Sequence, residues 1–378
     1  MIDLAEYYQL LKAEGIEFVT GVPDTLLNDF CLGLDTIWPS SHHVIAANEG
    51  NAIGLASGYH LATDTIPLVY MQNSGLGNAM NPLISLADPA VYSIPMVMLI
   101  GWRGEPGVSD WPQHQRQGEL TPVMLDSLGV RYQVLEADDA VSDATYRAIR
   151  TARDTRRPTA LLVRKGVMAK KEKSGFDDTK QQYSLSREEA IRAILAVAPP
   201  DAIFVASTGR MSRELHAVRT ELGHPHHHDF LNVGAMGHTL SIAAGIAAAR
   251  PGRPVVCLDG DGSALMHLGS LPVTAQLSLP NLTHVVLNNG AHESVGGQPT
   301  VGYSANLTEL AKASGYATPN SYIETPEGVA QAISQLLGSS GPSFFEVRIR
   351  KGMRSDIPVL KIDPLDQKSG LLKQFSQA

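Results

Sequence analysis

The chain has 378 residues, enough for two domains, and its 43% hydrophobic and 18% charged residues are ordinary for a globular protein with a buried core. A formal net charge of −8 argues against a nucleic-acid or anionic-membrane partner, because both carry negative charge themselves. The N-terminus has acids where a signal peptide has basic residues, and no apolar run reaches the ~18 residues of a membrane span. The two cysteines form no CxxC pair. We therefore expect a cytoplasmic protein.

The first half of the chain alternates apolar strands with helices. Leu4, Tyr7, Tyr8 and Leu11 recur at helical spacing and predict an amphipathic opening helix. Helices are also expected to begin at Thr25 and to fill residues 50–61, where small residues dominate. Apolar and partly β-branched runs predict buried parallel strands at 18–20, 43–46, 65–71, 94–100 and 160–164.

A charged, polar stretch at residues 166–186 predicts a linker between two halves. The second half, 187–350, opens with Ser186 and Glu189 at the spacing of a helix capping box. Its strands are expected at 202–206, 254–258, 284–287 and 344–349, and a polar tail follows at 351–378. The predicted fold class is therefore α/β, with two doubly wound, mostly parallel sheets in residues 1–165 and 187–350 and no central third domain.

The strongest local signal is the run Gly260–Ser263, followed 28 residues after Asp261 by Asn289. Each short pattern alone is more often a turn, but both lie at the predicted carboxyl ends of parallel strands, where open α/β sheets bind ligands. Gly260 and Gly262 allow the backbone to approach a phosphate, and Ser263 would open a helix whose positive end faces it. Oxygens of Asp261, Asn289 and the Ala291 carbonyl suit Mg²⁺.

Other phosphate-binding patterns fit less well. Neither residues 260–265 nor residues 75–80 have the third glycine of a dinucleotide fingerprint, and no Gly-Lys-Ser/Thr loop exists. A nucleotide- or phosphate-binding protein without thiamine chemistry nevertheless remains an alternative of a different class. The histidine-rich run 224–229 is interpreted as a polar loop, because it lacks metal-binding partners at a recognisable spacing.

The Gly-Asp-Gly run and Asn289 at this spacing resemble the thiamine diphosphate motif of the decarboxylase superfamily. A second segment, 234–238, resembles the part of that family that holds the cofactor bent. The resemblance implies that the Gly234 carbonyl meets the aminopyrimidine and that Met236, otherwise an ordinary core methionine, lies between the two rings. It implies thiamine diphosphate and Mg²⁺ as cofactors, and Asp261, Asn289 and Ala291 as the metal ligands. The residues implied to contact the cofactor are Glu49, Asn73, Thr208, Gly209, Gly234, Met236, Gly260, Asp261, Gly262, Ser263 and Asn289.

Glu49 is expected to be a buried acid, because it ends a predicted strand and precedes a helix of small residues. Burial raises the affinity of a carboxylate for its proton. The run 48–52 resembles the activating glutamate motif of the same family, which implies that Glu49 shares a proton with a ring nitrogen of the aminopyrimidine. In this family the two kinds of domain face each other across subunits. The resemblance therefore implies a homodimer or a higher oligomer, with active sites at the subunit interface.

Two glycine-punctuated loops, 70–78 and 101–118, carry the candidate substrate residues, although solvated loops have the same composition. Together with 21–24 and 289–298 they closely resemble the phosphonopyruvate decarboxylases, over residues 15–350. The related sulfopyruvate decarboxylases share the cofactor motifs but resemble the 103–118 loop less, and usually consist of two separate chains. The resemblance implies decarboxylation of 3-phosphonopyruvate in phosphonate biosynthesis; sulfopyruvate or another 3-substituted pyruvate remains open.

A substrate with a phosphonate beside a carboxylate needs local positive groups in this acidic chain. Arg103, His114, Arg116 and His292 are the candidates for these anion contacts, because arginine forks match phosphonate oxygens. Asp24 and His114 are candidates for proton transfer. We therefore predict Glu49, Asp24 and His114 as catalytic residues.

Overall fold

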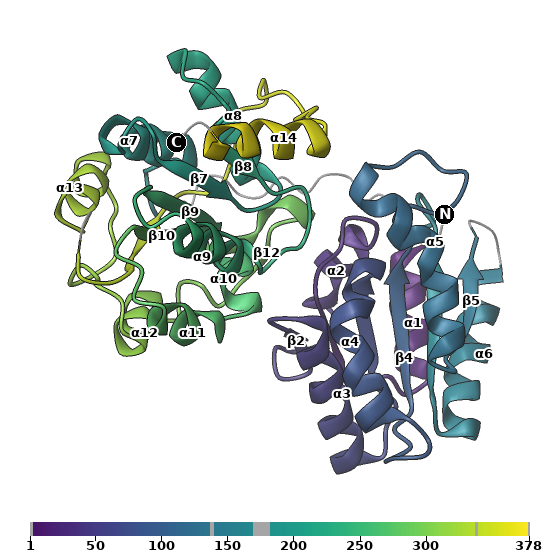
Figure 1. Ribbon diagram of the computed structural model, residues 1–378. Helices are drawn as coiled ribbons and strands as arrows, with labels where there is room; N and C mark the ends of the chain where they lie inside the picture. Colours follow the sequence, from purple (N-terminus) through teal and green to yellow (C-terminus); the bar gives the residue numbers. More distant parts are fainter. Residues whose placement is uncertain (1–2, 137–139, 169–181, 337–338, 377–378) are drawn as a thin grey trace. The chain divides into compact units, whose positions relative to one another are not determined.

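A computed structural model describes residues 3–136, 140–168, 182–336 and 339–376 (Figure 1). The chain divides into two compact units, one of Met1–Gly175 with Val295–Gln298, the other of Phe176–Ser294 with Pro299–Ala378. Most of the predicted linker, residues 169–181, lies outside the described residues. In the described part of the chain, no helix has both the length and the apolar character needed to cross a membrane.

The first unit contains a six-stranded parallel sheet of order β2-β1-β3-β4-β6-β5. Its two faces carry separate hydrophobic cores, so the central strands β3 and β4 are buried on both sides. Its strands are β1 (Val19–Gly21), β2 (His43–Ile45), β3 (Leu68–Gln72), β4 (Met96–Gly101), β5 (Arg131–Leu135) and β6 (Pro158–Val163), and its helices are α1 (Leu4–Ala13), α2 (Asn28–Leu34), α3 (Glu49–Thr63), α4 (Leu76–Pro82), α5 (Pro112–Ser127) and α6 (Ala140–Thr155), with the short turns Asn73–Gly75 and Leu83–Ala87 around α4.

The second unit contains a five-stranded parallel sheet of order β13-β10-β9-β7-β8, again with a core on each face. Its strands are β7 (Ile203–Ala206), β8 (Asp229–Leu231), β9 (Val255–Gly260), β10 (Leu282–Asn288) and β13 (Ser343–Arg348), and its helices are α7 (Arg187–Val197), α8 (Arg210–Leu222), α9 (Thr239–Ala249), α10 (Asp261–Met266), α11 (Ser270–Gln276), α12 (Leu307–Ser314), α13 (Pro326–Leu336) and α14 (Pro364–Ser376). Short strands β11 (Ala291–His292) and β12 (Gln298–Pro299) follow β10. The predicted α/β class with two parallel sheets is confirmed.

One local prediction is confirmed and several others differ from the structure. The predicted capping box is present, because the Ser186 side chain accepts from the Glu189 N–H and Glu189 accepts from the Ser186 N–H. The helix expected from Ser263 begins two residues earlier, at Asp261, and the helix expected from Thr25 begins at Asn28. The tail expected to be a polar extension contains α14, whose Leu371 is buried and whose Gln367 bonds both backbone groups of Leu231.

Candidate active site

Asp261 and Asn289 lie side by side at the carboxyl edge of the second sheet. Strands β9 and β10 are neighbours, with Leu287 opposite Gly260, so both strands end at the same level. The backbone N–H of Asn289 hydrogen-bonds to the Asp261 carboxylate. The Asp261 side chain is buried and also accepts a hydrogen bond from Thr300. This proximity is the condition that a shared metal ion requires.

Burial raises the pKa of Asp261 to about 6. A desolvated carboxylate of this kind is stabilised in its ionised form by a bound cation, so the residue fits a Mg²⁺ ligand. A hard cation of this kind prefers oxygen ligands, which Asp261 and the Asn289 side chain both contain.

The two consecutive asparagines differ in what their side chains do. Asn288 is fully buried, donates to the Gly302 carbonyl and to Glu346, both at 2.8 Å, and accepts from the Gly290 N–H. Its hydrogen-bonding groups therefore serve the fold. Asn289, one residue later, accepts from the Ala291 N–H at 3.1 Å and donates to Glu293 at 2.9 Å.

The segment 234–238 forms a tight turn next to the Gly-Asp-Gly run. Ala235 and Gly237 both have positive φ, 49° and 86°, and the Gly237 N–H donates to Ser263 Oγ at 3.1 Å. A side-chain carbon placed at Gly262 would lie 3.6 Å from Met236 Cε, so the methionine reaches over the glycine. Ser263 therefore holds the turn, and Met236 lies next to the Gly-Asp-Gly run.

His292 borders the same glycine but is not a positive group. Its ring lies 3.0 Å from the side-chain position at Gly262. Burial lowers the pKa of His292 to about 4, so the ring is neutral at pH 7. The expected anion contact can therefore be a hydrogen bond from the ring, but not a charge–charge attraction.

Thr208 and Gly209 follow β7, the neighbour of β9 in the sheet. Gly209 is the N-cap of α8 and makes no side-chain capping bond. The 13-residue α8 directs the positive end of its dipole to this edge, and such a helix end favours anions. Strand ends β7, β9 and β10 thus bring Thr208, Gly209, Asp261 and Asn289 to one edge of the sheet.

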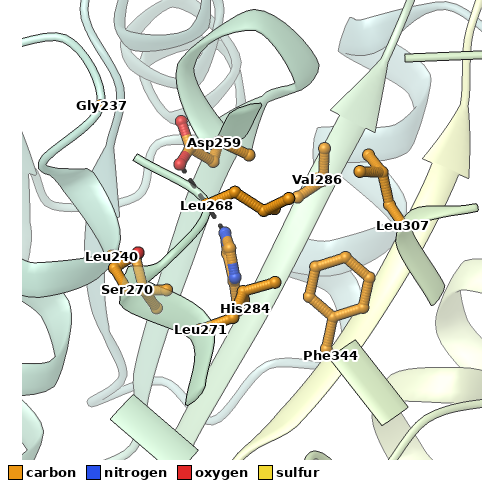
Figure 2. A pocket seen from close by; sticks show the side chains of 11 residues that line it. Gly237, Leu240, Asp259, Leu268, Ser270, Leu271, His284, Val286, Leu307 and Phe344 are labelled. Atoms are coloured by element: carbon orange, nitrogen blue, oxygen red, sulfur yellow. Dashed lines mark ion pairs between the residues drawn. The ribbon is translucent and has the colours of Figure 1, made fainter. Parts of the chain in front are cut away.

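A small closed cavity lies beneath this edge (Figure 2). Its volume of about 10 Å³ holds no more than one water molecule, so it is not the cofactor site. Asp259 and His284 face each other across it, with the carboxylate and ring nitrogen 3.7 Å apart, and Cys257 is close to both. Asp259 lines this cavity, whereas Asp261, two residues later, lies beside Asn289 at the end of the strand.

Glu49 is the first residue of α3 in the first unit, and its side chain is buried. The Asn78 side-chain amide donates to Glu49 Oε2 at 2.8 Å, which orients the carboxylate. A side-chain carbon at Gly75 would lie 2.4 Å from Glu49 Cγ and Oε1. Glu49 therefore occupies a niche that closes if Gly75 acquires a side chain.

Asp24 is a second buried acid in this unit. It follows β1, is fully buried, and accepts from the Leu26 N–H at 3.0 Å. Burial raises the pKa of Asp24 to about 6, against the smaller opposing effect of that hydrogen bond. Asp24 can therefore hold or release a proton near neutral pH, as a general acid or base requires.

Arg103 forms a two-point ion pair with Asp110, from Nε at 2.7 Å and from Nη2 at 2.6 Å, and donates to Thr25 at 2.8 Å. Its charge is thus already compensated, which the sequence interpretation did not foresee. Both residues line a cavity of about 510 Å³, within the ~300–1,000 Å³ range of small-molecule sites. The other lining residues are Thr25, Leu26, Trp102, Gly104, Glu105, Val108, Ser109, Trp111 and Lys165.

The remaining predicted residues of the first unit have different surroundings. His114 is partly buried on α5, and burial followed by the charge of Arg103 lowers its pKa. The Arg116 side chain is 75% exposed and pairs with Glu119 at 2.8 Å along the helix surface. Asn73 is fully buried and bonds both backbone groups bordering Arg103, donating to its carbonyl and accepting from its N–H, and also donates to Thr121. Asn73 therefore anchors the loop.

Sequence patterns did not indicate Asp110, Lys165, Thr300 or Glu293, each of which contacts or lines these sites. The signal that was available was their position, because all four belong to loops that follow sheet strands. Polar residues are ordinary in such loops, and only the folded contacts distinguish these ones.

Comparisons with known proteins agree with this geometry. Residues 5–126 match the family "Thiamine pyrophosphate enzyme, N-terminal TPP binding domain", and residues 207–347 match "Thiamine pyrophosphate enzyme, C-terminal TPP binding domain". Phosphonopyruvate decarboxylase of Streptomyces viridochromogenes is 33% identical over 97% of this chain and 93% of its own. That of Streptomyces hygroscopicus is 32% identical over 96% and 92%. Sulfopyruvate decarboxylase of Methanosarcina acetivorans is 27% identical over 94% and 93%.

The two parallel sheets and both family matches define a thiamine diphosphate-dependent enzyme. Within that class the chain belongs to the phosphonopyruvate decarboxylase family. The Methanosarcina relative matches across both halves of this chain, so the fusion of two halves in one polypeptide does not separate the two substrate types.

Proposed function

We propose that this enzyme decarboxylates 3-phosphonopyruvate to phosphonoacetaldehyde and CO₂, with thiamine diphosphate and Mg²⁺, as a step of phosphonate biosynthesis. The observation that carries the proposal is near-full-length similarity to two phosphonopyruvate decarboxylases, joined to the adjacent Asp261 and Asn289. Identity to the sulfopyruvate decarboxylase is lower over a similar length, so sulfopyruvate or another 3-substituted pyruvate is the alternative.

The second unit would hold the diphosphate end of the cofactor. Asp261 and Asn289, with the Ala291 carbonyl, would bind Mg²⁺, since magnesium takes a few protein oxygens together with phosphate oxygens. Thr208, Gly209 and the Gly-Asp-Gly run would face the phosphates. Met236, which reaches over Gly262, would support the bent cofactor, and the Gly234 carbonyl in the same turn would accept from its aminopyrimidine.

The first unit would supply the acid–base groups. Thiamine diphosphate, when bound, supplies the electron sink for the electron pair that CO₂ leaves behind. Glu49, oriented by Asn78, would hold a proton at the aminopyrimidine nitrogen. Asp24, with its pKa near 6, would carry a proton to or from the reacting carbon. His292 of the second unit, neutral at pH 7, would donate a hydrogen bond without adding charge.

Substrate recognition would involve the cavity beside Arg103. Two of its lining residues, Arg103 and Lys165, are cations, and Asp110 compensates one of them. A dianionic substrate would compete with Asp110 for the arginine fork, which gives the site a preference for strongly charged anions over neutral 2-oxo acid side chains. Arg116 would contact the substrate only after leaving Glu119, with which its exposed side chain pairs.

A homodimer or larger assembly would complete the site. Helix α3, which begins with Glu49, exposes Leu55 and Leu61 beside Gly54 and Gly58, whose side-chain positions meet no other atom within 4 Å. Exposed apolar faces of this kind usually pack against another protein surface. A second copy on this face would bring the Glu49 helix to the subunit interface.

The test is an aldehyde-release assay with phosphonopyruvate and sulfopyruvate measured side by side. We expect higher kcat/KM for phosphonopyruvate; the reverse order would assign the alternative substrate, and no release from either would overturn the proposal. A thermal-shift comparison separates the other class of function. Stabilisation is expected from thiamine diphosphate plus Mg²⁺ and not from NAD or ATP.

A further inference from the structure

Glu293 is a partly buried carboxylate whose oxygens are all engaged by groups of the second unit. Arg187 contacts Oε2 at 2.6 Å, Arg210 contacts Oε1 at 2.6 Å, and the Gly352 N–H also donates to Oε1. The fourth contact comes from Asn289, whose Nδ2 donates to Oε2 at 2.9 Å. Glu293 therefore connects α7, α8 and the C-terminal segment to the asparagine proposed as a metal ligand.

These contacts fix which way the Asn289 amide faces. A carboxylate accepts hydrogen bonds but does not donate them, so it selects the NH₂ side of the amide. The Ala291 N–H, a donor, selects the oxygen side at 3.1 Å. Both neighbours favour the same orientation, with Oδ1 turned away from Glu293. Magnesium binds the oxygen of an asparagine and not its nitrogen, so this orientation is the one that a ligand needs.

Two arginines of the second unit, Arg187 and Arg210, contact the two oxygens of the Glu293 carboxylate. Arg187 is itself buried and also pairs with Glu214 at 2.5 Å. Two arginines and two glutamates thus form a charge-balanced group behind Asn289.

We propose that Glu293 is a positioning residue for the metal site, acting by holding the Asn289 amide with its oxygen available to the cation. The inference rests on the proposed function, because it assumes that Asn289 binds Mg²⁺. Partners behind metal ligands are worth roughly 10–100-fold in metal affinity or activity in other proteins, which sets the expected size of the effect.

The matched experiment compares Glu293→Gln with Glu214→Gln. Both substitutions remove one buried partner of Arg187, but Glu214 does not contact Asn289. The measurement is the Mg²⁺ concentration that half-saturates binding of thiamine diphosphate, followed by the change in protein fluorescence without substrate. We expect Glu293→Gln to raise it about 10–100-fold and Glu214→Gln to change it less than about threefold, while both lower Tm.

Equal shifts in the two variants, or no shift in a folded Glu293→Gln protein, would overturn the inference. If Glu293→Gln does not fold, Glu293→Asp serves instead: it keeps the charge for the arginines but shortens the reach to Asn289, and the same rise is expected. Measurements on the wild-type protein distinguish a failure of the proposed function from a failure of the positioning role. Absence of Mg²⁺-dependent binding in the wild type contradicts the proposed function, whereas normal wild-type binding with an unaffected Glu293→Gln contradicts the positioning role alone.

Discussion

Gly75 and Glu49 are in such close contact that a methyl group at residue 75 would lie 2.4 Å from the glutamate side chain. The two residues come from different strand ends, Glu49 after β2 and Gly75 after β3. Asn78, just beyond Gly75, donates to the same carboxylate at 2.8 Å. The turn at 73–78 therefore determines where the proposed activating acid can lie.

Gly75→Ala is expected to displace Glu49 and to lower kcat by at least about tenfold, with the loss of about 1–3 kcal/mol of stability that overpacking usually brings. Gly77→Ala is the matched control, because residue 77 lies in the adjacent helix with no atom within 4 Å of its side-chain position. Alanine there should leave kcat unchanged. Steady-state kinetics and thermal unfolding of both variants test this. Equal kcat values would contradict the claim that Gly75 determines the position of Glu49.

Glu49→Gln keeps the size of the side chain but removes its ability to hold a proton. Because general acid–base groups contribute about a hundredfold to ten-thousandfold, we expect kcat to fall by that amount. Binding of thiamine diphosphate, measured by calorimetry, should change much less. A variant that retains wild-type turnover would remove Glu49 from its proposed role.

Asp261→Ala removes the buried carboxylate of the proposed metal site. Retention of thiamine diphosphate after gel filtration in Mg²⁺ should be lost, whereas the wild type should lose it only after EDTA treatment. The variant without cofactor should unfold at an equal or higher temperature than the wild type near pH 8, because a desolvated charge has been removed. Cofactor retention by Asp261→Ala would contradict the ligand assignment.

Most of the fold could be predicted from the sequence because most strands are continuous apolar runs. The exceptions have identifiable causes. In strand β5, Arg131 is exposed and the next three residues are only partly buried, since the strand lies at the edge of its sheet. Strand β8 has three residues and begins at Asp229, the last residue of the histidine-rich run. The apolar residues of α14 are interspersed with polar ones. Neither pattern is distinguishable from a loop by composition.

The candidate site was predictable for those residues that directly follow a predicted strand. Asp261 and Asn289 each follow a strand directly, and parallel neighbouring strands must end at one edge. Side-chain pairing was not predictable, because it depends on rotamers set by packing between distant segments. The sequence suggests Arg103 as a free cation, yet Asp110 occupies its fork. His292 is similar: its identity is visible in the sequence, but the burial that keeps it neutral is not.

Arg103→Met and Arg116→Met separate the two arginines first proposed as anion contacts. Arg103 lines the cavity of about 510 Å³, whereas Arg116 is 75% exposed and pairs along its helix. We expect Arg103→Met to raise KM for phosphonopyruvate at least about tenfold, as loss of a charge-assisted contact of about 1.5–3 kcal/mol implies. Arg116→Met should change KM less than about twofold. A larger effect at Arg116 would move the anion site to the helix surface.

Asp24→Asn should lower kcat and raise the free energy of unfolding, and the gain in stability should depend on pH. Burial raises the pKa of Asp24 from 3.8 to about 6, so its contribution to stability is complete below pH 3.8 and is lost as the pH rises through 6. This difference corresponds to about 3 kcal/mol as an upper limit. Asparagine does not ionise, and it can still accept from the Leu26 N–H. The cofactor-free variant should therefore gain stability relative to the wild type from pH 5 to pH 8, while kcat falls. Urea unfolding at several pH values measures the difference.

Asp261, whose pKa is raised to a similar value, is present in both proteins, so its contribution cancels. A stability difference that does not change with pH would mean that Asp24 is not protonated near pH 6, and it could not then carry the proposed proton.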